Sequence, residues 1–214
     1  MSARPPFPAG IAPRLARVVT ELITRRPVLW PLFRTATKLE FDRLARRWDV
    51  GRNAAHLASF EAALEAVPAD PRRALDLGTG TGAGAFAMAR RFPAAEVVGV
   101  DLSPAMVERA REKLPPEVAG RVRFEQADGA ALPFPDGFFD VVGLANMIPF
   151  FDEVARIVAP GGWVVIGFSI GPNTPIYVPA ERLRRELSER GFRDIREVAA
   201  GPGTALLARK SSEE

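Results

Sequence analysis

The 214-residue sequence predicts an α/β protein with a doubly wound, seven-stranded and mainly parallel sheet, closed by an antiparallel C-terminal hairpin and preceded by a helical extension. Three observations predict this fold. From residue 73 onward, short apolar runs alternate with helical stretches, as in a sheet with helices on both faces. A glycine-rich turn at 78–84 follows the first apolar run and precedes an alanine-rich helix. Near the end, the turn at 200–203 is short enough to force antiparallel pairing of its flanking strands.

The chain divides near residue 70 into an N-terminal helical extension, residues 1–70, and a Rossmann-like sheet domain, residues 71–214. The first ten residues are rich in proline, and we expect them to be disordered. In the rest of the extension apolar residues recur at helical spacing, and Pro27 and Pro31 interrupt the pattern. The expected helices are 11–25, 32–48 and 53–67.

In the sheet domain, central strands are recognised by almost wholly apolar runs, because both of their faces are buried. The first strand ends at the glycine turn, and the other expected strands are 97–100, 122–126, 139–144, 163–168, 194–199 and 204–209. The alternation of apolar and charged residues in 122–126 indicates a sheet edge. Helices are expected at about 83–92, 104–114, 151–158 and 179–190, with Ser103 as an N-cap and Gly191 as a C-terminal stop.

Composition excludes several kinds of chemistry. The chain has no cysteine and one histidine, so disulfides, thiolate nucleophiles and Cys-ligated zinc are ruled out and no metal site is expected. No apolar run approaches the 18 or so residues of a membrane span, and the proline-rich start does not resemble a secretory signal. A cytoplasmic protein is therefore expected.

The charge is unevenly distributed, with a balance of +6 in residues 1–50 and −3 in the remainder. A basic prefix can attract nucleic acid, anionic lipid or an acidic ligand. We interpret it first as the solvated face of amphipathic helices. Peripheral membrane contact through these helices remains an alternative, and nucleic acid is not expected because no recognition module accompanies the basic residues.

Carboxylates stand at the ends of three successive expected strands: Asp76, Asp101 and Asp128. In open parallel sheets ligands bind beyond the carboxyl ends of the strands, and an acid at the tip of the second strand can hold a ribose diol through two hydrogen bonds. The turn also satisfies the dinucleotide pattern through Gly78, Gly80 and Ala83, so these residues alone leave a nicotinamide cofactor open.

Residues from about 73 to 168 resemble the class I S-adenosylmethionine-dependent methyltransferases, and within them the small-molecule branch that includes quinone-biosynthesis methyltransferases. Five marks in order carry the resemblance: Asp76-x-Gly78-x-Gly80-x-Gly82, Asp101, Asp128, the Leu132–Asp140 segment and Pro160-Gly161-Gly162. The resemblance implies that the cofactor is S-adenosyl-L-methionine and that the acceptor is a small, at least partly apolar molecule. It also implies that the N-terminal helices form a substrate lid.

The resemblance assigns the methionine moiety of the cofactor to the glycine turn, which comprises Gly78, Thr79, Gly80 and Thr81. Asp76 would lie near the amino group of the cofactor, or would only tie down the loop. Asp101 would accept hydrogen bonds from both ribose hydroxyls.

For the adenine, the resemblance implies packing against Leu102 and Met106, which as apolar helix residues can equally be core. Asp128 would accept a hydrogen bond from the exocyclic amine, with a backbone N–H from Ala127 or Gly129. Position 128 can instead be a turn aspartate before a glycine.

The segment 143–150 follows the fourth strand and is expected to line the reaction pocket. It lacks the Asn/Asp-Pro-Pro-aromatic motif of amino-group methyltransferases and the histidines of many small-molecule relatives. Asn146 would contact cofactor or substrate. If the acceptor must lose a proton, His56 and Tyr177 are the sole bases of their kinds, although a lone histidine is more often a surface or packing residue.

Two other functions are compatible with parts of the sequence. A nicotinamide-dependent oxidoreductase would use the dinucleotide pattern and Asp101, but Asp76, Asp128, the closing hairpin and the long helical prefix argue against it. A non-catalytic relative would keep the fold as a binding module. The intact glycines and acids of the predicted cofactor site argue against this function. Binding of S-adenosylmethionine, of NAD or of neither would separate the three.

Overall fold

The computed structural model describes residues 13–50 and 54–212, so the expectation for residues 1–10 lies outside the described residues. This part of the chain contains a seven-stranded sheet in the order β3-β2-β1-β4-β5-β7-β6. Strands β1 to β5 are parallel, and β7 pairs antiparallel with both β5 and β6. The strands are β1 (Arg73–Leu77), β2 (Glu96–Asp101), β3 (Val122–Gln126), β4 (Phe139–Ala145), β5 (Val158–Phe168), β6 (Phe192–Ala200) and β7 (Gly203–Lys210). The predicted fold class is confirmed, with β3 at an edge.

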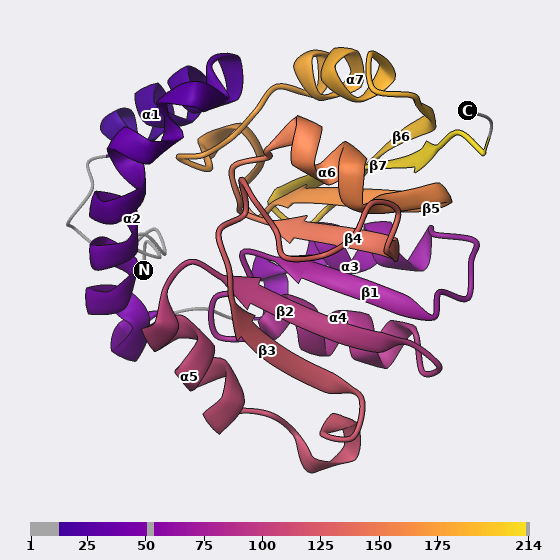
Figure 1. The fold of residues 1–214 in the computed structure, drawn as a ribbon, viewed down its shortest axis with the longest axis horizontal. Coiled ribbons are helices and arrows are strands. Elements are labelled where there is room, and N and C mark those ends of the chain that lie inside the picture. The colour runs from indigo at the N-terminus through magenta and orange to yellow at the C-terminus, as the bar shows by residue number, and fades with distance from the viewer. Residues whose placement is uncertain (1–12, 51–53, 213–214) are drawn as a thin grey trace.

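Helices cover both faces of the sheet (Figure 1). On one face lie α3 (Ala58–Glu65), α4 (Ala83–Arg91) and α5 (Pro104–Glu112), which pack against alternate strand residues such as Val97, Val141 and Val165. The neighbouring residues Val98, Val142 and Val164 point to the other face, against α6 (Phe151–Ile157) and α7 (Ala180–Ser188). The strand order reverses between β1 and β4, and the cleft at such a reversal is where open α/β sheets bind ligands.

Helix α3 belongs to the packing of the sheet. A short 3₁₀ turn, η3 (Ala54–His56), precedes it, and Phe60 in α3 is 1% exposed. Its ring packs onto two strand glycines: a Cβ at Gly143 would lie 2.7 Å from Phe60 Cζ, and one at Gly167 would lie 3.1 Å from Phe60 Cβ. Within its described residues, 13–50 and 54–70, the extension predicted over 1–70 therefore contains one α-helix that packs on the sheet and two that do not.

The two other helices cross the carboxyl edge of the sheet (Figure 1). They are α1 (Pro13–Arg25) and α2 (Trp30–Leu44), joined by η1 (Pro27–Leu29) and followed by η2 (Ala45–Arg47). Glu21 of α1 pairs with Arg182 of α7 at 2.9 Å, and Asp42 of α2 accepts a hydrogen bond from Ser103, ahead of α5, at 2.6 Å. We call residues 13–50 the cap, because they span this edge from α7 to α5.

Local sequence signals account for several element ends. The Ser103 hydroxyl accepts the Met106 N–H at 3.1 Å, as an N-cap should, and Gly191 has φ +83° where α7 stops. Pro31 was expected to interrupt the helices, yet α2 begins at Trp30. Proline is accepted in the first turn of a helix, where its missing N–H would have had no intrahelical partner.

We expect Phe60→Ala to lower the free energy of unfolding by about 3–5 kcal/mol, because it opens a cavity against two glycines that cannot fill it. Chemical denaturation measures the change. Leu32→Ala, at a 75% exposed position in α2, is the matched control and should alter stability by less than about 0.5 kcal/mol. Equal effects of the two substitutions would contradict the assignment of α3 to the sheet core.

Candidate cofactor and acceptor site

The glycine turn leaves β1 in a conformation that side chains disfavour. Gly78, Gly80 and Gly82 have φ of +74°, +54° and +92°, and Gly82 caps α4. The N–H groups of Gly78 and Thr79 both donate to the carbonyl of Val100 at 2.9 Å, which ties the turn to the end of β2. The result is a turn that lacks a Cβ at three positions just before a helix, a backbone geometry suited to close contact with a polar ligand.

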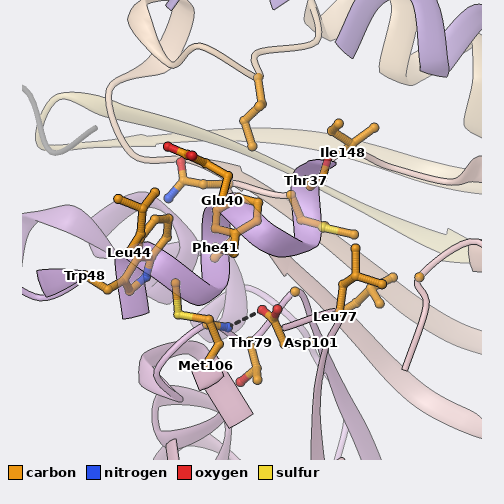
Figure 2. Close-up of a pocket in the computed structure, with 18 of the residues that line it drawn as sticks. Thr37, Glu40, Phe41, Leu44, Trp48, Leu77, Thr79, Asp101, Met106 and Ile148 are labelled. Carbon is orange, nitrogen blue, oxygen red and sulfur yellow. Dashed lines mark hydrogen bonds between the residues drawn. The ribbon is translucent and has the colours of Figure 1, made fainter. Parts of the chain in front are cut away.

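Asp101 joins two loops of the site. One carboxylate oxygen accepts the Gly80 N–H (Figure 2) and the other accepts the Ser103 N–H, each at 2.9 Å. A carboxylate oxygen has two lone pairs, so each keeps one for a further donor. Burial raises the pKa of Asp101 to about 6, although the N–H donors of Ser103 and Gly80 favour the charged form. This geometry fits two ribose hydroxyls, the role that the resemblance implies.

Asp76 lies deeper, at the end of β1, and is almost fully buried. Its Oδ2 accepts the Thr79 hydroxyl at 2.6 Å, and a Cβ at Gly84 would lie 2.5 Å from its Oδ1. Burial raises its pKa to about 6, against the hydrogen bonds from Thr79 and from the Ala85 N–H. These contacts describe a carboxylate that ties down the turn, and its contact with the amino group of the cofactor stays a prediction.

A cavity of about 560 Å³ extends from this turn to the cap. Many of the residues singled out from the sequence line it: Asp76, Gly78, Thr79, Gly80, Thr81, Asp101, Leu102, Met106, Ala127, Gly129, Asn146 and His56. They come from the ends of β1, β2 and β4 and the loops that follow them, from the loop after β3, from α5 and from η3. Parallel strands bring these distant segments to one edge, as the sequence reasoning expected.

The cap supplies the opposite wall. One face of α2 turns Thr37, Glu40, Phe41 and Leu44 toward the strand ends, and Trp48 follows (Figure 2). Trp48 lies directly over the glycine turn, because a Cβ at Gly80 would lie 3.0 Å from its indole nitrogen. Among the aromatic residues that precede β1, Phe33, Phe41 and Trp48 line the cavity and Phe60 is core.

Asp128 is not among the residues that line the cavity, although Ala127 and Gly129 on either side are. Its Oδ1 accepts the indole N–H of Trp30 at 2.8 Å and the Ala130 N–H at 3.0 Å, and Arg34 lies 3.4 Å from Oδ2. The cap thus engages the carboxylate that the resemblance assigns to the adenine amine, and that assignment stays a prediction. No local sequence signal points to Trp30 as the partner of Asp128, because the two residues lie 98 positions apart.

Asn146 and His56 meet at the other end of the cavity. Asn146 has φ +55°, and its Oδ1 accepts both the N–H and the hydroxyl of Ser169 at 2.9 Å. These bonds leave its amide nitrogen 3.4 Å from His56 Nε2. Because an amide nitrogen is only a donor, this orientation favours the His56 tautomer with Nε2 as acceptor. Both residues can therefore present polar groups to a bound molecule.

Tyr177 is not brought to the cavity wall. Its ring packs edge-on against Phe168 with centroids 5.1 Å apart. Burial raises the pKa of the phenol, and the nearby carboxylates of Glu181 and Glu197 raise it further, so the phenolate that a base would need is disfavoured. Tyr177 is a candidate base because it is the sole tyrosine of the chain, but it does not line the cavity with the other candidate residues.

Sequence reasoning missed Glu40, whose carboxylate points into the cavity with its side chain 18% exposed (Figure 2). The signal was present, since positions 33, 37, 40 and 44 share one helix face and interrupt an apolar wall with two polar residues. No group of three or more potential metal ligands gathers among residues 13–50 and 54–212.

Comparison with known proteins matches residues 74–162 to a methyltransferase domain family. A demethylmenaquinone methyltransferase of Thermus thermophilus is 42% identical over 142 residues, which cover 59% of this chain and 62% of the relative. A malonyl-[acyl-carrier protein] O-methyltransferase of Halorhodospira halophila is 38% identical over 152 residues, covering 66% and 50%. The chain thus spans less than two thirds of either relative. A solved structure of a SAM-dependent methyltransferase from Aquifex aeolicus shares the fold, with a TM-score of 0.64 at 19% identity over 78% of this chain and 97% of that one.

These findings show that residues 74–162 match a methyltransferase domain and are similar to quinone-biosynthesis methyltransferases, and the sheet has the fold of a SAM-dependent methyltransferase. The family's cofactor is S-adenosylmethionine, and the Cβ-free turn and the free lone pairs of Asp101 fit it. The antiparallel hairpin of β6 and β7 and the family match decide against the nicotinamide alternative, which rested on Gly78, Gly80 and Ala83.

Asp101→Ala should weaken binding of S-adenosylmethionine about tenfold to a hundredfold, because ribose hydroxyls left without an acceptor cost about 1–3 kcal/mol. Calorimetry on the folded variant measures the loss. An unchanged affinity would remove Asp101 from the cofactor site.

Affinity for the cofactor should also depend on pH. With a pKa of about 6, Asp101 gains a proton as the pH falls from 7 to 5, and a protonated carboxyl accepts fewer hydrogen bonds. We therefore expect the dissociation constant of the wild type to rise over this range and to vary less in Asp101→Asn. If Asp101→Asn showed the same pH dependence, the pH dependence would be assigned to Asp76 instead, whose pKa is also about 6.

Trp30→Phe should lower the free energy of unfolding by about 1–3 kcal/mol, because it removes the N–H that donates to a carboxylate and keeps an aromatic ring against Phe150. A double-mutant cycle with Asp128→Ala isolates the bond. We expect a coupling energy of at least about 1 kcal/mol, and a value near zero would show that the bond does not hold the cap.

Proposed function

We propose that this protein transfers a methyl group from S-adenosylmethionine to a small, at least partly apolar acceptor, with the cap as the wall that positions it. One observation carries the proposal: the cavity reaches without a break from the glycine turn and Asp101 to the apolar face of α2. Its volume of about 560 Å³ falls in the range of roughly 300–1,000 Å³ common for small-molecule sites.

The acceptor end of the cavity supports an apolar molecule with a polar group. Phe33, Phe41 and Leu44 line it from α2, and Met147 and Ile148 line it from the loop after β4. Glu40, His56 and Asn146 are polar groups in the same lining. A ring or chain with a hydroxyl would satisfy both kinds of contact.

The names of the relatives also bear on the chemical class of the acceptor. The names of the two relatives specify demethylmenaquinone for one and a malonyl-acyl-carrier conjugate for the other, so acceptors differ among proteins with similar methyltransferase domains. Of these two, the apolar lining favours an acceptor of the first kind. We therefore choose demethylmenaquinone as the first acceptor to test.

Methyl transfer mainly requires that the acceptor be held close to the methyl group of the cofactor and in line with it. The bound cofactor would supply an electrophilic methyl group on a sulfonium, so an aligned acceptor in a dry site needs little further activation. The aromatic wall of α2 and Trp48 excludes water above the glycine turn. Where the acceptor must lose a proton, Glu40 is the carboxylate that faces it, and His56 hydrogen-bonded to Asn146 is the alternative base.

Methyl transfer from radiolabelled S-adenosylmethionine tests the proposal directly. We expect label in demethylmenaquinone, and in a cell extract we expect it in the lipid or small-molecule fraction. Label found only in RNA or protein, or no label in any fraction while the cofactor binds, would contradict the proposed acceptor class. Loss of cofactor binding itself would contradict the methyltransferase function.

We predict that Glu40→Gln lowers kcat at least about tenfold and leaves the affinity for S-adenosylmethionine within about twofold, because a lost general base typically costs about 10²–10⁴. Steady-state kinetics and calorimetry measure the two quantities. Glu61→Gln, on exposed surface of α3, is the matched control. An unchanged kcat in Glu40→Gln would exclude its carboxylate from proton transfer and leave His56→Gln as the next test.

A further inference from the structure

Exposed apolar side chains concentrate on the cap. Six large apolar residues of the described chain are exposed, and all lie in residues 13–50: Leu15, Val18, Val28, Leu32, Leu39 and Val50. Val28 is 81% exposed and Leu32 75%. Single exposed apolar residues are ordinary, but a set confined to one element of a protein indicates a contact surface.

Apart from Val50, these residues occur on both cap helices and on the short turn between them. Along α2, Leu32, Ala36 and Leu39 stand at i, i+4 and i+7 and are exposed, and Ala36 and Leu39 also line the cavity. Leu15 and Val18 stand together on α1. We define the outer cap face as these five exposed apolar residues together with the exposed arginines near them in the sequence. The apolar residues are Leu15, Val18, Val28, Leu32 and Leu39, and the arginines are Arg14, Arg17, Arg26 and Arg34.

Arginines border this face with few acids to oppose them. Residues 13–50 hold nine basic and four acidic side chains. The acids are already engaged: Glu40 lines the cavity and lies 3.9 Å from Arg43, Asp42 accepts from Ser103 and pairs with Lys38, and Asp49 binds Thr81 and Lys113. Glu21 pairs with Arg25 and Arg182. The outer cap face is therefore apolar and positively charged.

The cavity opens onto the same face. Leu15 of α1 and Leu39 of α2 line the cavity and are also exposed to solvent, at 58% and 47%. An apolar molecule that entered between them would remain in contact with apolar side chains from the surface inward. Such an entrance suits an acceptor that is delivered by an apolar phase.

We propose that the outer cap face docks on an anionic lipid bilayer and that the acceptor enters the cavity from it between Leu15 and Leu39. The choice of occupant rests on charge: arginines attract anionic headgroups while Val28 and Leu32 enter the interface. No described helix is long and apolar enough to cross a bilayer, so contact would be peripheral. The route of the acceptor rests on the proposed function, whereas the docking does not.

Two other occupants fit less well. A second copy of the chain would bring two arginine-rich faces together, and like charges in contact are destabilising. Nucleic acid would satisfy the arginines but would leave Val28 and Leu32 without partners, since phosphate contacts carry most of that affinity. Docking of a second copy and docking of nucleic acid each predict a binding experiment with a different outcome from docking on a bilayer.

The test is co-sedimentation of the full chain with vesicles of phosphatidylcholine alone or mixed equally with phosphatidylglycerol. We expect binding to the mixed vesicles and much less to the neutral ones. The double variant Val28→Ser with Leu32→Ser should lower the partition coefficient at least about tenfold, and Arg26→Glu at least about fivefold. Arg72→Glu, an equally exposed arginine at the amino edge of the sheet, is the matched control and should change nothing.

Binding of S-adenosylmethionine is measured in the same variants. Unchanged cofactor affinity with lost vesicle binding supports the docking surface independently of any acceptor. Equal binding of wild type and double variant, or no binding to anionic vesicles, would overturn the proposal. So would a soluble dimer that the double variant dissociates, or RNA binding that depends on Arg26 and not on Val28 and Leu32.

Discussion

The geometry of the site depends on the two hydrogen bonds that the Asp101 carboxylate accepts. They fix the turn after β1, through Gly80, to the start of α5, through Ser103, so that two loops from different strands move as one unit. Burial disfavours the charged form of these carboxylates, because it raises the pKa of both Asp101 and Asp76 to about 6. A carboxylate kept in such surroundings is typical of a site that uses its charge.

The cap is attached to these same loops. Asp49 accepts the Thr81 hydroxyl at the turn after β1, Asp42 accepts the Ser103 hydroxyl after β2, and Trp30 donates to Asp128 after β3. The loops after β1, β2 and β3, which would contact the cofactor, are therefore also points where the cap is held. The same side chains thus hold the cap, which would face the acceptor, and shape the cofactor site. A change in the position of one should therefore affect the other.

Much of this arrangement follows from the sequence. The strand ends, the glycine turn and the closing hairpin could be predicted because each depends on local rules, such as apolar runs and positive φ at glycine. The Leu132–Asp140 segment, which carried part of the family resemblance, ends in Asp140, whose carboxylate accepts the N–H groups of Arg72 and Arg73 at the start of β1. The bonds between the cap and the loops could not be predicted, since they join residues 32 to 98 positions apart. The same holds for α3, whose helical pattern is evident but whose contact with two strand glycines is set by the fold.

The central claim is that the cap and the cofactor loops form one site. Hydrogen–deuterium exchange with and without S-adenosylhomocysteine measures it most directly. The coupling predicts slower exchange in the glycine turn and in the loops after β2 and β3, and also along α2, where Phe33, Phe41 and Leu44 face the same cavity. Protection of the loops with no change in α2 would show that the cap is independent of the cofactor and would contradict the claim.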